Sequence, residues 1–178
     1  MAVERVEQLL LEFTGALNSA GLDYAVIGGN AVAAWVATVD EGAVRATKDV
    51  DILVRREDLA HIAEVARPLN LMPVEVMSVH MMVDCDRPSP KTGIHFVIAG
   101  ERIRAEYKHP APDPSNSTLS PSGFRLINLP ELVAMKLQAN RNIDRAHIED
   151  LASVDLVTNE VRAALPSDLL ARLNEILA

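Results

Sequence analysis

The chain has 178 residues, 49% of them hydrophobic and 24% charged, a balance typical of a globular protein with a buried core. Its formal net charge of −8 argues against broad, sequence-independent binding of DNA or RNA, which needs clustered positive charge. No stretch approaches the roughly 18 consecutive apolar residues of a membrane span, and Cys85 is the one cysteine, so we expect a cytoplasmic protein without a disulfide framework.

The first half of the sequence alternates between helical and strand patterns. Apolar residues recur at helical spacing near the N-terminus, and a short apolar run then leads through a glycine pair into an alanine-rich segment. In chain order we expect a helix over 3–19, a strand over 23–28, a helix over 30–38, a loop over 39–47, a strand over 49–55 and a helix over 57–67.

The second half begins with weak alternation and ends in helical periods. A long loop over 108–123, rich in proline and serine, separates the two patterns. We expect strands over 71–77, 79–84 and 124–127, a loop over 86–91, and helices over 129–140, 144–155 and 167–177. The sequence thus predicts an α/β (α+β) fold that gives way to helices, with a core over residues 1–128 and a helical segment over 129–178 packed on it as one compact unit.

A β-hairpin is predicted in the middle of the chain. One strand covers 94–99, Gly100-Glu101 forms a two-residue turn, and the return strand covers 102–107. In this register His95 lies directly opposite Glu106, with both side chains on the same face.

Two carboxylates, Asp49 and Asp51, stand within the apolar strand expected over 49–55. Residues at i and i+2 of a strand share a face, and two like charges beside a core need a compensating cation. Because Mg²⁺ accepts carboxylates as its protein anchors, we expect Asp49 and Asp51 to bind Mg²⁺ or Mn²⁺. The alternative is an edge strand whose acidic face is exposed to solvent.

Upstream, the strand over 23–28 ends in Gly28-Gly29, and a helix follows directly. A helix N-terminus that begins with residues lacking side chains offers backbone N–H groups to a phosphate. Alone, the glycine pair also fits an ordinary tight turn. Together with the two aspartates, it predicts a site for a nucleoside triphosphate.

With these residues the sequence resembles the nucleotidyltransferase superfamily, whose fold is that of polymerase-beta-like enzymes. It is most similar to the small bacterial minimal nucleotidyltransferases and to the nucleotidyltransferase toxins of abortive-infection systems. The matching segments are Gly28-Gly29, 45–51, 96–101 and 132–137. The resemblance implies a nucleotidyltransferase-like mixed sheet flanked by helices, with a C-terminal helical segment.

The resemblance also implies a reaction and a set of nucleotide-binding residues. A nucleoside monophosphate would pass from an NTP–Mg²⁺ complex to a hydroxyl of an acceptor (a small molecule, a protein or an RNA end), with release of pyrophosphate. Gly29 and Asn30, beside Gly28, would hold the β- and γ-phosphates. Lys136 would point at the triphosphate, the alternative being a surface lysine on an amphipathic helix.

Four basic residues bracket the strand that carries the two aspartates. We expect Arg45 and Lys48 to contact the nucleotide, with solvated strand-end charges as the alternative. For Arg55 and Arg56 the solvated interpretation is favoured.

Superfamily members use a third carboxylate on a neighbouring strand, and here His95 stands at the expected place. Imidazole is a poor Mg²⁺ ligand and supplies no negative charge. Three alternatives follow: His95 is a general base oriented by Glu106, Glu106 replaces the missing acid, or the site binds a nucleotide without catalysis. A half-buried histidine with a structural partner is the remaining interpretation of His95.

Further along, Asp144 and Asp150 resemble acidic residues that follow the lysine in related toxins, although Asp144 also fits a helix N-cap. His147 has no second ligand at zinc spacing, and we assign it no role. Three functions follow: a nucleotidyltransferase, a catalytically inactive nucleotide-binding module, or an interaction module of toxin–antitoxin type that meets its partner through the Pro-rich loop and the C-terminal helices.

Overall fold

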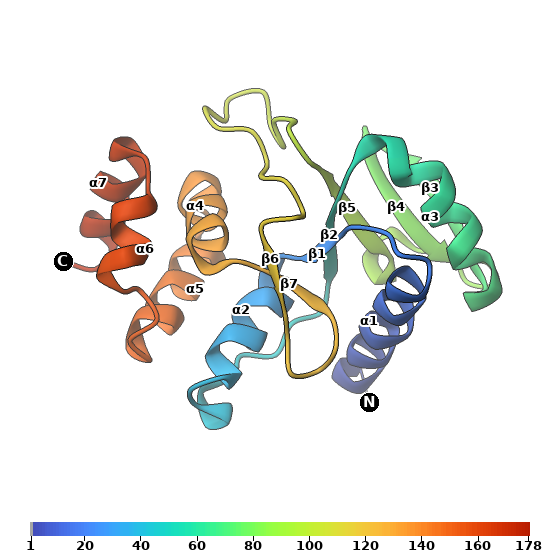
Figure 1. Cartoon of the computed structure of the whole chain (residues 1–178), viewed down its shortest axis with the longest axis horizontal. Helices are drawn as coiled ribbons and strands as arrows, with labels where there is room; N and C mark the ends of the chain where they lie inside the picture. The colour runs from blue at the N-terminus through green and yellow to red at the C-terminus, as the bar shows by residue number, and fades with distance from the viewer. Residues whose placement is uncertain (1) are drawn as a thin grey trace.

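The computed structural model of the chain describes residues 2–178, and within them the strands form one seven-stranded mixed sheet surrounded by helices (Figure 1). The strands are β1 (Ala25–Val26), β2 (Val50–Val54), β3 (Leu71–Val76), β4 (Val79–Asp84), β5 (Ile94–Ile98), β6 (Ser117–Leu119) and β7 (Arg125–Ile127). The helices are α1 (Ala2–Ser19), α2 (Gly28–Ala37), α3 (Leu59–Ala66), α4 (Leu129–Ala139), α5 (Asn142–Ser153), α6 (Asn159–Ala164) and α7 (Ser167–Ile176). The strand order is β3-β4-β5-β2-β1-β7-β6.

Strand β2 lies inside the sheet, between β5 and β1. It runs parallel to β5, in a register that pairs Asp51 with His95, and antiparallel to β1. Its apolar residues Val50 and Ile52–Val54 are at most 1% exposed, because both faces of the strand are covered. The alternative of an edge strand with a solvated acidic face is therefore wrong.

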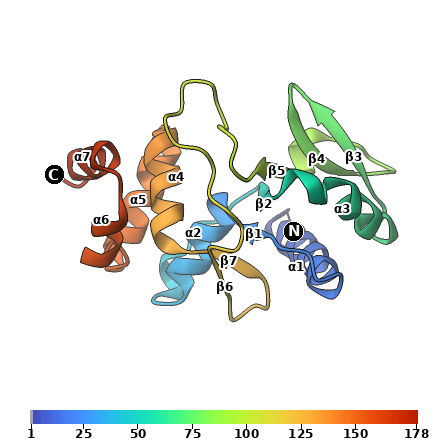
Figure 2. The ribbon, with the colours of Figure 1, turned by 45° about the horizontal axis from the view of Figure 1, so that its top comes forward.

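The helices form two groups that contact different parts of the sheet. Helices α1 and α3 contact each other beside the β3–β4 hairpin, whereas α2 packs on β2 and also contacts α4 and α5. In Figures 1 and 2 the β3–β4 hairpin and the α6–α7 pair lie at opposite ends of the molecule. The α2–α5 contact brings the C-terminal helices against the turn that links β1 to α2.

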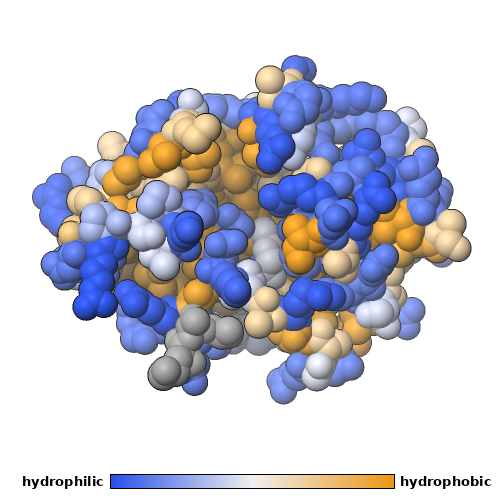
Figure 3. All heavy atoms as spheres, turned by 180° about the vertical axis from the view of Figure 1, so that it is seen from behind, coloured by the Kyte–Doolittle hydropathy of each residue, from blue (hydrophilic) through white to orange (hydrophobic). Residues whose placement is uncertain are grey.

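The interior is aliphatic, as the low aromatic content of 3% requires. Among the fully buried side chains are Phe13, Leu17, Ile52, Leu53 and Leu132. Hydrophilic residues cover most of the face shown in Figure 3, and hydrophobic residues appear there in smaller groups. No helix within residues 2–178 combines the length and the apolar character that crossing a membrane requires.

Most of the predicted elements are confirmed, and so is the fold class. The first helix, the strand over 49–55, the two strands over 71–84 and the helix over 129–140 are present with small shifts in their ends. The predicted helix over 144–155 begins at Asn142, and the six-residue helix α6 was not predicted.

The predicted return strand over 102–107 is wrong. Strand β5 ends at Ile98, and both of its edges are already occupied, one by β2 and the other by β4. No edge is left with which a segment after Gly100 could form a ladder. Segment 102–107 instead belongs to a loop, and five of its six residues are exposed.

This loop is held in place at several points, although it has no regular structure. Backbone bonds join Gly100 N–H to the Ala111 carbonyl (2.9 Å) and Ala111 N–H to the Glu101 carbonyl (2.8 Å). The Arg55 guanidinium donates hydrogen bonds to Asp113 of the loop (2.8 Å) and to Asp23 (2.7 Å), which lies two residues before β1. Arg55 therefore links the sheet to the loop and is not a solvated strand-end charge.

Candidate functional site

The turn between β1 and α2 lies directly against the carboxylate of Asp51. Gly28 has a φ of +68°, and a Cβ built at this position would overlap the Asp51 side chain. The adjacent backbone is fixed as well, since the Ile27 N–H donates to the Asp51 carbonyl at 3.1 Å. Only glycine satisfies both the left-handed φ and the close approach, so the glycine holds Asp51 next to the start of α2.

The N-terminus of α2 is not capped by a side chain. Ile27 is its N-cap residue, and an isoleucine cannot accept hydrogen bonds from the first N–H groups of the helix. The N-terminus of this ten-residue helix therefore retains the positive end of the helix dipole and donors suited to an anion.

Gly29 and Asn30 contact the segment that precedes β2 and hold it against the start of α2. A Cβ at Gly29 would lie 2.7 Å from Thr47 Oγ1, so Thr47 sits against the glycine backbone. Asn30 Nδ2 donates to the carbonyl oxygen of Asp49 at 2.6 Å. In this structure Asn30 positions Asp49, and its contact with a phosphate stays a prediction.

His95 lies beside Asp51 on the neighbouring strand. Its Nδ1 is 3.7 Å from Asp51 Oδ1, an ion-pair distance, and its Nε2 is 2.7 Å from the Pro90 carbonyl oxygen. Because a carbonyl oxygen only accepts, Nε2 carries a proton, and Nδ1 is the atom turned to the aspartate. Asp51 raises the pKa of His95 above its usual value, although burial opposes the shift and the Pro90 carbonyl supports it.

The acidic groups fit a metal that arrives with a nucleotide rather than a resident metal. Within residues 2–178 no group of three or more histidine, cysteine, aspartate or glutamate side chains is arranged to hold a metal ion. Asp51 is about one-third exposed at the site, and Asp49 stands one residue before β2, close enough for its charge to act on His95. Mg²⁺ needs only one or two carboxylates when phosphate oxygens and water complete its shell.

A cluster of charges, in which Lys136 of α4 and Asp144 of α5 are buried and Arg141 is partly exposed, borders this region. Lys136 Nζ is 3.2 Å from Asp144 Oδ1, and Arg141 Nε is 2.7 Å from Asp144 Oδ2. Burial lowers the pKa of Lys136 against the opposing charges of Asp144 and Asp51. Asp144 also accepts the backbone N–H of Arg141 at 3.2 Å from the third position of α5, so it caps the helix from within rather than as the N-cap residue itself.

Of the two other basic candidates, Arg45 is already paired. Its guanidinium donates two hydrogen bonds to the Asp150 carboxylate of α5, at 2.9 and 3.0 Å, and this pair fastens the loop before β2 to α5. Lys48 is exposed to solvent. A nucleotide that reached Arg45 would compete with Asp150 for the guanidinium.

Glu106 does not stand opposite His95, since the strand that was to carry it does not form. Its side chain is 68% exposed, and its ion-pair partner is Arg104 at 3.9 Å. Together with Tyr107 and Lys108 it lines a cleft of about 330 Å³ that is closed on its other side by α4 and α7. The geometry that made Glu106 a substitute acid is therefore absent.

The sequence interpretation missed His147, which lies against the glycine turn. Its ring Cε1 is 3.7 Å from the position of a Cβ at Gly29, and the residue is 8% exposed. Burial, together with the charge of Lys136, lowers its pKa to about 4. One signal was available, because His147 follows Asp144 by three positions on a helix and therefore shares its face.

No protein-family model and no curated protein sequence matches the chain. Solved structures do match it. The crystal structure of ANT(2'')-Ia in complex with adenylyl-2''-tobramycin is 16% identical, with a TM-score of 0.58 over 96% of this chain and 98% of that one. The solution structure of the antibiotic-resistance factor ANT(2'')-Ia is 13% identical, with a TM-score of 0.56 over 99% of this chain and 92% of that one.

A third match is the crystal structure of an antigenic nucleotidyltransferase-like protein from Paracoccidioides brasiliensis. It is 13% identical, with a TM-score of 0.52 over 98% of this chain and 94% of that one. At these identities the similarity defines the fold. The fold of the chain is that of a nucleotidyltransferase, as its sequence predicted.

Proposed function

We propose that the protein binds a nucleoside triphosphate with Mg²⁺ and transfers the nucleotidyl group to a hydroxyl of a small acceptor molecule. The observation that carries this proposal is the contact between Gly28 and Asp51. It places a carboxylate at the uncapped N-terminus of α2, so that one anion-binding and one cation-binding group stand side by side. A metal–triphosphate complex carries the complementary pair of charges.

In this reaction the acceptor oxygen forms a bond to the α-phosphorus, the bond from that phosphorus to the oxygen bridging to the β-phosphate breaks, and pyrophosphate leaves. Mg²⁺, when bound, neutralises charge on the phosphates. Asp49 and Asp51 would hold the metal, and the N–H groups at Gly29 and Asn30 would hold phosphate oxygens. The proton of the acceptor hydroxyl goes to a base, for which His95 is the candidate nearest to Asp51.

For the acceptor we propose the 330 Å³ cleft beside α4 and α7. Tyr107, which lines the cleft, and Asp51 both act electrostatically on Arg141, so the cleft and the aspartate lie within range of the same guanidinium. The cleft carries charges of both signs, among them Arg104, Lys108 and Asp168. The adenylylated tobramycin bound to ANT(2'')-Ia supports a small molecule with hydroxyl groups as the acceptor class.

One observation favours a second candidate, nucleotide binding without turnover. By the resemblance, His95 stands where superfamily members carry the third acid, and its ring nitrogens lie against the Pro90 carbonyl and the Asp51 carboxylate. A site with two carboxylates and an engaged histidine can hold a metal–nucleotide complex without a group free to accept the proton.

Two measurements separate these functions. Thermal shifts with ATP, GTP, CTP and UTP, each with and without Mg²⁺, test binding, and a nucleotide that stabilises the fold only with Mg²⁺ supports both candidates. Turnover of α-labelled nucleotide in the presence of small-molecule and macromolecular cell fractions then tests transfer. Label on an acceptor supports the enzyme, binding without label supports the second candidate, and stabilisation by no nucleotide contradicts both.

A further inference from the structure

One buried polar atom in this region has no partner. Within residues 2–178, Nδ1 of His147 is one of three buried side-chain atoms without a hydrogen bond. Leaving such an atom unpaired costs stability, and an apolar side chain of similar size would fill the same space without that cost. A histidine at this position therefore calls for a ligand that the isolated chain does not contain.

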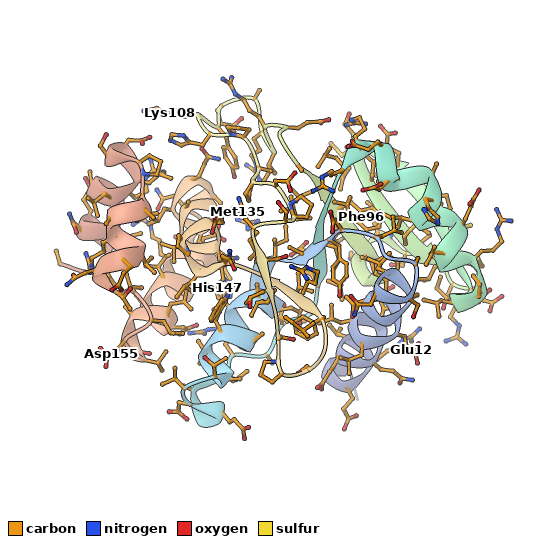
Figure 4. All side chains as sticks on the ribbon, viewed as in Figure 1. Glu12, Phe96, Lys108, Met135, His147 and Asp155 are labelled. Atoms are coloured by element: carbon orange, nitrogen blue, oxygen red, sulfur yellow. The ribbon has the colours of Figure 1, made fainter. Side chains whose placement is uncertain are left out.

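The position of the ring indicates where that ligand binds. His147 comes from α5 and lies where α5 faces α2 (Figure 4). The atom 3.7 Å from the Cβ direction of Gly29 is Cε1, the carbon bonded to both ring nitrogens, so the edge of the ring that carries the nitrogens is the edge that faces the glycine turn. Thr47 lies in the same direction, with its Oγ1 2.7 Å from the position of a Cβ at Gly29.

The charge state of His147 suits a donor to an anion. Four charged side chains act on it, Lys136 and Arg45 lowering its pKa and Asp144 and Asp150 raising it, but burial outweighs them all. The ring is therefore neutral at pH 7, and a neutral imidazole with its proton on Nδ1 donates one hydrogen bond from that atom. The helix N-terminus beside it provides further N–H donors to the same anion.

We propose that His147 is a nucleotide-binding residue whose Nδ1–H donates a hydrogen bond to an oxygen of the phosphate chain at the N-terminus of α2. The inference rests on the proposed function, because it requires a phosphate at the Gly28-Gly29 turn. It adds a third element to that site: α2, Thr47 and His147 all lie beside Gly29.

Two substitutions test the role of Nδ1. His147→Leu removes the nitrogen and keeps an apolar side chain, so without ligand its free energy of unfolding should equal or exceed that of the wild type. Its affinity for Mg²⁺–ATP and for inorganic triphosphate should fall by about 10- to 100-fold, as expected when a hydrogen bond to a charged group is lost. His147→Asn, whose amide nitrogen stands near the position of Nδ1, should stay within about threefold of wild-type affinity.

Controls separate this role from a general loss of imidazole. His61→Leu removes an exposed histidine of α3 and should leave both affinities unchanged. Adenosine without phosphates should bind His147→Leu and wild type equally. If His147→Leu does not fold, His147→Gln replaces it, because its amide nitrogen stands near Nε2 instead of Nδ1 and should lose the affinity that His147→Asn retains.

The outcomes are distinct for the two proposals. Wild type that binds Mg²⁺–ATP while His147→Leu binds triphosphate within twofold of wild type would overturn the role of His147 and leave the proposed function standing. Wild type that binds triphosphate through His147 but binds no nucleotide would support His147 and overturn the proposed function. Wild type that binds neither would overturn both.

Discussion

Replacing Gly28 with alanine should destabilise the protein through two separable effects. The first is the left-handed φ of +68°, which costs an L-residue about 1–2 kcal/mol. The second is the overlap of the new Cβ with the Asp51 carboxylate, and displacing a packed group of this kind costs a further 1–3 kcal/mol or so. We therefore expect Gly28→Ala to lose about 2–5 kcal/mol of unfolding free energy.

Gly21 offers a matched control for this prediction. Its φ of +66° is nearly the same, but a Cβ there would meet no atom within 4 Å. Gly21→Ala should therefore lose only the unfolding free energy that the left-handed φ costs. Urea denaturation measures both losses. Removing the carboxylate with Asp51→Ala should rescue Gly28→Ala, with a coupling energy of about 1–3 kcal/mol in the double-mutant cycle. A coupling energy near zero, together with equal losses at the two glycines, would refute the contact between Gly28 and Asp51.

The remaining predictions concern the phosphate turn, the buried charges and the third acid. Gly29→Val should abolish measurable binding of ATP in calorimetry while adenosine binding persists, and a folded variant that binds ATP normally would contradict the phosphate-binding role of the turn. Asp144→Asn should lose about 3–5 kcal/mol at pH 7, because Lys136 is left buried without its counter-charge, and adding Lys136→Met should restore most of it in urea denaturation. Burial raises the pKa of Asp144, but hydrogen bonds from Arg141 and the charge of Lys136 lower it overall. The stability that the Asp144 carboxylate contributes is therefore fully present above its unfolded pKa near 4, and it is lost as the pH falls through the lower folded pKa. The difference in unfolding free energy between Asp144→Asn and wild type should accordingly narrow below about pH 4. A difference that widens there would be evidence against the Lys136–Asp144 pair. Glu106→Gln should change nucleotide affinity by less than about twofold, because its carboxylate is exposed and its partner Arg104 lies on the same loop, and a surface pair is worth about 0–1 kcal/mol. If the protein binds nucleotide without turnover, His95→Asp should create labelled-nucleotide transfer, whereas a loss of existing turnover would identify His95 as the base.

Local patterns predicted the elements whose apolar residues repeat with a regular period. The helix over 3–19 and the strand over 49–55 were found because their apolar residues repeat with the period of the element. The interior position of β2 agrees with its sequence, since Val50, Ile52, Leu53 and Val54 are apolar and buried.

The failures have a different origin. The hairpin after Gly100 was locally plausible, but β5 pairs with β2 and β4, and this non-local pairing leaves no free edge for 102–107. No role was assigned to His147 because metal-ligand spacing takes account only of the residues near a histidine in sequence. Its burial depends on the packing of α5 against α2, which only the fold reveals.

In the candidate site, too, some features could be predicted from the sequence and others only from the fold. The sequence linked Asp51 to the glycine turn because the turn follows one predicted strand and Asp51 lies on the next predicted strand along the chain. It did not show that Arg45 is held by Asp150 or that Asn30 holds the Asp49 carbonyl, since both contacts depend on how side chains orient in the folded chain.

The central claim is that Asp51, held against the N-terminus of α2, binds a metal that arrives with a nucleoside triphosphate. Calorimetric titration of ATP into wild type and Asp51→Asn, each with and without Mg²⁺, tests it most directly. The substitution removes one charge at nearly constant shape, so the fold should survive. We predict that Mg²⁺ raises the ATP affinity of wild type by about tenfold or more and leaves that of Asp51→Asn unchanged. An equal gain from Mg²⁺ in both proteins would contradict the claim.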